Sequence, residues 1–171
     1  QYAARLGPTP CTVAVHGWGK DLVKELLSLG ANPSVSNEMG SALLSAISRR
    51  SAKMFLFLVD KGAKVDNKMT YMIEPIKLPD FVASPRMVST LLHAVVHANS
   101  FFNSNFLDSK TRESRNYRPG SKDHEKIIHF LVEEGYVSLD EVNECGETAL
   151  ELARFEANEK MAALLQSLKE R

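Results

Sequence analysis

The strongest constraint in this sequence is an apolar pattern that recurs along the chain. In each copy two adjacent apolar residues are followed, four positions after the first, by two more, which places all four on one side of an α-helix. The copies are Leu22, Val23, Leu26 and Leu27; Met54, Phe55, Leu58 and Val59; Ile127, Ile128, Leu131 and Val132; and, more weakly, Lys160, Met161, Leu164 and Leu165. In the first three copies a glycine follows that can end a helix, at Gly30, Gly62 and Gly135. The pattern predicts a chain built from helical repeats.

A second recurring pattern precedes these helices and predicts a shorter helix in each repeat. Its pieces are Thr9-Pro10, Thr90-Leu91-Leu92-His93-Ala94, and residues 146–153 with the sequence GETALELA. The loops Gly30-Ala31-Asn32 and residues 62–66, with the sequence GAKVD, follow the longer helices. Together these motifs resemble the ankyrin repeat, whose period is about 33 residues and whose signature is T-P-L-H-x-A. The resemblance covers most of the chain, in four repeats.

The resemblance implies an all-α fold, an ankyrin-repeat solenoid of stacked helix-turn-helix units with two inserted loops. We expect a single domain over residues 1–171, with repeats at about 7–39, 40–66, 85–143 and 144–171 and insertions at 67–84 and 99–121. The insertions follow from the spacing of equivalent residues, which is much longer on both sides of the third inner helix than elsewhere. Ser84 and Pro85 suit a cap and a first helical residue, so this helix is predicted to run from near Pro85 to Ala98.

Composition limits the classes of function. The chain has 171 residues, of which 44% are hydrophobic and 25% charged, and its formal net charge is zero. This balance favours a globular domain with no overall attraction to nucleic acid or to a membrane. Cys11 and Cys145 fall in the first and last repeats, so an ordered stack would keep them too far apart for a disulfide. We expect a monomer when free, cytoplasmic by default, or secreted or periplasmic if a signal peptide was removed before Gln1.

The two insertions carry most of the residues that we expect to contact a partner protein. Insertion 67–84 is more apolar than a solvated loop usually is, and insertion 99–121 combines phenylalanines with several arginines. Tyrosine, tryptophan and arginine are enriched at the energetically dominant positions of interfaces. The predicted partner-binding residues are Trp18, Tyr71, Phe81, Phe101, Phe102, Arg112, Arg115, Tyr117 and Arg118. The alternative for insertion 99–121 is that its phenylalanines cover the helix below while its arginines are solvated.

Residue patterns for catalysis are weak. His93 and His97 have the i, i+4 spacing of a zinc pair, but Ala94 stands where the H-E-x-x-H motif has its general base. The ankyrin resemblance instead gives His93 a structural role, in which it ties neighbouring loops by hydrogen bonds. Cys11 and His16 could form a nucleophile and base, yet no acidic residue to orient the histidine is evident. We therefore predict no catalytic or metal site and no cofactor.

The predicted function is a protein–protein interaction module that binds a partner through its concave inner-helix face and inserted loops. The alternative is a dedicated inhibitor or immunity protein that occludes the active site of a partner enzyme. The competing enzymatic class is a zinc-dependent or Cys/His-dependent hydrolase, for which stoichiometric zinc in the purified protein would be evidence.

Overall fold

The structure is a computed structural model that describes residues 9–17, 19–37, 40–66, 68–71, 88–101 and 122–171. The chain forms two compact units, residues 1–65 and residues 66–171, and each unit is described by itself. The expectation that residues 1–171 form a single domain stays a prediction.

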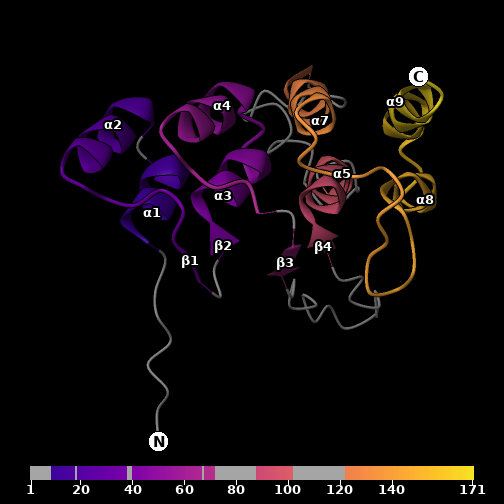
Figure 1. The fold of residues 1–171 in the computed structure, drawn as a ribbon, viewed down its shortest axis with the longest axis horizontal. Helices are drawn as coiled ribbons and strands as arrows, with labels where there is room; N and C mark the ends of the chain where they lie inside the picture. The colour runs from indigo at the N-terminus through magenta and orange to yellow at the C-terminus, as the bar shows by residue number, and fades with distance from the viewer. Residues whose placement is uncertain (1–8, 18, 38–39, 67, 72–87, 102–121) are drawn as a thin grey trace, which may run out of the picture. The chain divides into compact units, whose positions relative to one another are not determined.

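The first unit consists of two helix pairs joined by a short antiparallel strand pair (Figure 1). Its elements are α1 (Pro10–Gly17), α2 (Lys20–Ser28), β1 (Ser36–Asn37), β2 (Gly40–Ser41), α3 (Ala42–Ser48) and α4 (Ala52–Asp60). Helix α1 packs against α2, and α3 packs against α4. The first helices of the two pairs, α1 and α3, also pack against each other, so this unit is a stack of two helix pairs.

The second unit also contains two helix pairs, but its longer strand pair precedes the first pair instead of joining the two. Its elements are β3 (Lys68–Tyr71), β4 (Val88–Thr90), α5 (Leu91–Phe101), α7 (Lys122–Glu133), α8 (Ala149–Phe155) and α9 (Glu159–Lys169). Helix α5 packs against α7, and α8 packs against α9. Helices α5 and α8 pack against each other. The stacking of helix pairs confirms the all-α repeat fold, to which the structure adds the two short strand pairs.

The predicted start of the third inner helix was wrong. Helix α5 begins at Leu91, because the Thr90 side chain accepts a hydrogen bond from the backbone N–H of His93, 3.3 Å away, and so caps the helix there. Residues Val88–Thr90 form strand β4, which pairs with β3 in antiparallel register. Pro85 itself lies outside the described residues.

Hydroxyl caps begin the first helix of each described pair. The side chains of Thr9, Ser41, Thr90 and Thr148 each accept a hydrogen bond from the backbone N–H three residues later. This bond satisfies one of the donors that a helix leaves unpaired at its N-terminus. The short helices therefore begin at positions that the sequence itself specifies.

Glycine ends the second helix of three pairs as the sequence predicts, and Gly135 shows how. Its φ of +70° is left-handed, and its N–H donates to the Val132 carbonyl over 3.1 Å. The following N–H, from Tyr136, reaches the Leu131 carbonyl over 2.9 Å. These two bonds form a Schellman motif, which closes the end of a helix.

The recurring apolar pattern forms the core, as predicted. Its fully buried members include Val23, Phe55, Leu58, Ile127, Ile128, Leu131 and Leu165. The last residue of each of the first three copies is half-buried: Leu27, Val59 and Val132. Within the described part of the chain, no helix is both long enough and apolar enough to cross a bilayer.

Candidate interaction surface

The structure does not test the partner-binding residues predicted from the sequence. Trp18, Phe81, Phe102, Arg112, Arg115, Tyr117 and Arg118 lie outside the described residues. Tyr71 is in strand β3 and Phe101 ends helix α5, but their side chains are not among those described. The described surface around α5 and α8 must therefore be built from other residues.

Helix α8 presents an exposed face that combines an aromatic side chain with a carboxylate. Phe155 is 65% exposed, and Glu151, one helical turn earlier on the same face, is also exposed. Val142 is 52% exposed, and a β-bridge joins its backbone to that of Thr148 at the start of α8. Sequence analysis overlooked Phe155, for which the only available signal was a large apolar residue outside the core pattern.

The charge of this region is strongly one-sided. Between residues 133 and 159 the sequence has a single lysine or arginine, Arg154, against a series of acidic residues. The acidic residues are Glu133, Glu134, Asp140, Glu141, Glu144, Glu147, Glu151, Glu156 and Glu159. The zero net charge of the whole chain therefore includes a segment, residues 133–159, that is rich in acidic residues.

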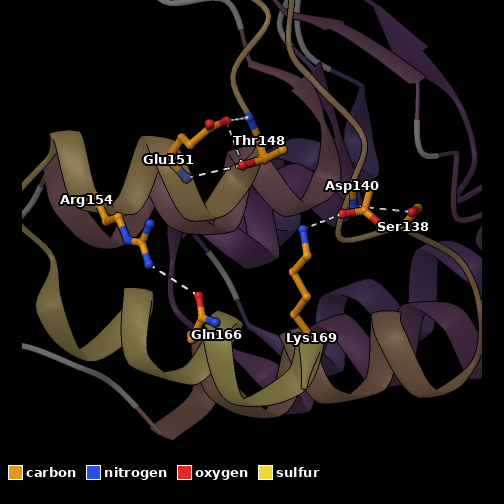
Figure 2. Close-up of polar contacts among 7 residues, drawn as sticks. All are labelled: Ser138, Asp140, Thr148, Glu151, Arg154, Gln166 and Lys169. Atoms are coloured by element: carbon orange, nitrogen blue, oxygen red, sulfur yellow. Dashed lines mark hydrogen bonds and ion pairs between the residues drawn. The ribbon is translucent and has the colours of Figure 1, made fainter. Parts of the chain in front are cut away.

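A capping box fixes the start of this helix face (Figure 2). The Glu151 carboxylate accepts hydrogen bonds from the backbone N–H and the hydroxyl of Thr148, over 2.7 Å and 2.8 Å. In return the Thr148 hydroxyl oxygen accepts from the Glu151 backbone N–H. The bond from the backbone of Thr148, followed by that from its hydroxyl, lowers the pKa of Glu151. The carboxylate is thereby held ionised and in a fixed position.

Polar side chains also connect α8 and the preceding loop to α9 (Figure 2). Arg154 donates to the Gln166 side chain over 3.2 Å, and Lys169 pairs with Asp140 at 2.6 Å. Arg154 and Lys169, two cations of this part of the chain, are therefore engaged by partners within the molecule.

His93 occupies the structural role that the resemblance implies. Its side chain is 1% exposed, with Nδ1 2.7 Å from the Thr90 hydroxyl and Nε2 2.9 Å from the Glu147 carbonyl oxygen. Burial, the largest cause, lowers the pKa of this histidine. Because both ring nitrogens are engaged, neither is available to a zinc ion. Among the described residues, no three metal-ligating side chains converge.

His97 makes a separate contact with the next helix pair. Its Nδ1 lies 2.7 Å from Oε1 of Glu156, the residue that follows α8, and both side chains are mostly buried. The two histidines of the HAVVH segment therefore each bind the neighbouring repeat rather than a shared ligand. Both histidines can be identified from the sequence, but no sequence pattern indicates that Glu147 and Glu156 are their partners.

The two cysteines differ in environment. Both are free thiols, Cys11 buried at 2% exposure and Cys145 exposed. Burial raises the pKa of the Cys11 thiol, so it holds less of the reactive thiolate than an ordinary cysteine does. This is the opposite of what an activated nucleophile needs. The side chain of His16, the base considered from the sequence, is not among those described.

The stacked helix pairs, hydroxyl caps and interlocking histidine define an ankyrin-repeat fold. The chain is similar to the crystal structure of an ankyrin repeat domain from Acinetobacter baumannii AYE, with a TM-score of 0.60 and 16% sequence identity. The similarity covers 95% of this chain, which spans 65% of the other. No family model and no curated protein matches the sequence. At this identity the similarity establishes the fold, while the partner must be argued separately.

Proposed function

We propose that this chain is a protein-binding module that holds its partner on the face formed by the first helix of each pair, together with the inserted segments. The ankyrin-repeat fold carries the proposal, because repeats of this kind expose an extended concave surface. Insertions in such repeats map to loops on one face, often the binding face. The proposed contacts include Tyr71, Phe81, Phe101 and Phe102, the arginines 112, 115 and 118 with Tyr117, and Trp18.

The described part of α8 supports this placement. Phe155 keeps 65% of its surface exposed although it belongs to a helix whose other apolar residues pack inward. Large aromatic side chains are frequent anchors of protein interfaces. Its neighbour Glu151 is held in place by the capping box, so a partner would meet an ordered carboxylate beside an apolar ring.

The test is a binding measurement with a partner captured by the intact chain and then purified. We expect the triple variant R115A/Y117A/R118A, and separately F155A, to weaken binding by more than tenfold. The matched control is Leu29→Ala, which removes an apolar side chain that is 77% exposed but lies just after α2, a second helix. If both test variants bind as tightly as the wild type, the proposed surface is wrong.

The inhibitor function is a narrower form of the same proposal. It requires that the captured partner be an enzyme and that the bound chain abolish its activity. Measuring the activity of the partner with and without a stoichiometric amount of chain separates an inhibitor from a scaffold. If the enzyme stays active in the complex, the inhibitor proposal is refuted and the binding-module proposal is unaffected.

A further inference from the structure

Helix α5 carries two histidines one turn apart, and both reach the next helix pair. His93 Nε2 lies 2.9 Å from the carbonyl oxygen of Glu147, which belongs to the connection between α7 and α8. His97 Nδ1 lies 2.7 Å from the carboxylate of Glu156 at the end of α8. The packing of α5 against α8 is thus accompanied by two histidine contacts of different chemistry, one with a backbone carbonyl and one with a charged side chain.

The surroundings of His93 require a neutral imidazole. A carbonyl oxygen only accepts, so Nε2 must carry the proton of the bond to Glu147. In a neutral ring with its proton on Nε2, Nδ1 is an acceptor, so the Thr90 hydroxyl donates to Nδ1 over 2.7 Å. A second ring proton would displace that hydrogen bond and place a cation in a site that is 1% exposed.

His93 contacts a turn that is organised by several hydrogen bonds within it. The Glu147 carbonyl also accepts from the backbone N–H of Asn143 at 2.8 Å. The buried Asn143 side-chain oxygen accepts from the N–H groups of Cys145 and Glu147, both at 2.9 Å. The turn 143–147 is therefore a closed unit, and the bond from His93 connects it to α5.

We propose that His93 is a pH-sensitive lock between α5 and the turn 143–147, which opens under mildly acidic conditions and exposes the Glu147 carbonyl and the buried Asn143. Opening exposes the His93 imidazole to water, where it is protonated more readily than in the buried, closed site. The acid-driven step is thus proton uptake coupled to loss of the bonds from His93 to Glu147 and Thr90.

The pKa of His93 agrees with this direction. Burial lowers it most, while the bond to the Glu147 backbone and the charges of Glu141 and Glu147 raise it less. A histidine with a lowered closed-state pKa binds its proton more tightly once the lock is open. Opening is therefore favoured as the pH falls below about 6.5, the ordinary histidine value, and the effect levels off below the closed-state pKa.

Several other titratable groups on α7, on α8 and in the connection between them are also buried or half-buried. They are Asp123, His124, Glu125 and His129 on α7, Glu141 and Glu147 in the connection, and Glu156 at the end of α8. His97 contacts the Glu156 carboxylate over 2.7 Å, at the end of α8 and outside the turn 143–147. The test must therefore change His93 alone and keep every other group in place.

The experiment measures amide hydrogen exchange of buried Asn143, whose N–H donates to the same Glu147 carbonyl as His93, in the intact chain between pH 8 and pH 5, corrected for the intrinsic exchange rate. In the wild type the opening constant should rise by up to about tenfold per pH unit below about 6.5, as uptake of one proton requires. In His93→Gln, whose amide still donates to the Glu147 carbonyl but does not titrate, it should be flat. His97→Gln, the matched control, should keep the wild-type slope.

A wild-type opening constant that is independent of pH would overturn the lock, as would a His93→Gln variant with the wild-type slope. If His93→Gln does not fold, an NMR titration of the wild-type protein tests the proposal instead. The His93 ring signals must then titrate in the same pH interval in which the Asn143 amide loses protection. Two separate intervals would refute the coupling.

Discussion

The turn between α8 and α9 offers a stability prediction that depends on one backbone angle. Ala157 has a φ of +53°, the left-handed region that side chains with a Cβ avoid. Two hydrogen bonds hold it there: its own N–H reaches the Arg154 carbonyl over 3.1 Å, and the Asn158 N–H reaches the Ala153 carbonyl over 2.9 Å. Ala157 is exposed, so its methyl group contributes little to the core.

The substitution Ala157→Gly should therefore stabilise the protein. Relief of the left-handed conformation contributes about 1–2 kcal/mol. The greater freedom of glycine in the unfolded chain removes about 0.4–1 kcal/mol of that gain. The net increase in the free energy of unfolding should be about 0.5–1 kcal/mol, which raises Tm by about 1–4 °C in a chain of this size.

The matched control reverses the change at an equivalent turn of the same unit. Gly135 has a φ of +70°, and a Cβ built there meets no atom within 4 Å. Gly135→Ala should therefore cost about 0.5–1 kcal/mol through backbone conformation alone. Urea unfolding followed by circular dichroism, compared at equal m values, measures both variants. The reasoning is refuted if Ala157→Gly lowers the midpoint or if both variants shift it in the same direction.

Three further predictions concern single sites. Thr148→Ala should cost about 1 kcal/mol of stability through loss of the cap, and an NMR titration should show the pKa of Glu151 rising towards its ordinary value. In the wild type the ionised Glu151 carboxylate stabilises the fold above its unfolded pKa, and this contribution is lost as the pH falls through its lowered folded pKa. The variant lacks this contribution, so acid should lower its free energy of unfolding by less. Iodoacetamide should label Cys145 in the native protein and Cys11 only after unfolding, as mass spectrometry can show, since Cys11 is buried with a raised thiol pKa. Phe55→Ala, at a site with 0% exposure, should cost about 3–5 kcal/mol in denaturant unfolding, and a cost below about 1 kcal/mol would contradict its place in the core.

The local features of the fold could be predicted from the sequence. The apolar pattern, the hydroxyl caps and the helix-ending glycines act within a few residues of themselves, so each can be identified without knowing the rest of the chain. The structural role of His93 also followed, through the resemblance of Thr90–Ala94 to the repeat signature. The same local logic failed at Pro85, where a plausible cap and first helical residue did not mark the start of α5, which the Thr90 cap sets at Leu91.

Tertiary structure alone decided what the helices contact. His93 meets Glu147 across 54 positions of sequence, and His97 meets Glu156 across 59. No periodicity specifies those partners, because they depend on how α5 and α8 pack after the intervening insertion. The exposure of Phe155 is settled in the same way, since an apolar side chain is buried only if another element covers it. The sequence by itself determined which side of each helix faces inward and where three of the longer helices end, because helical periodicity and the glycine caps are local. The pairing of residues between repeats required the folded chain, because it depends on distances in space.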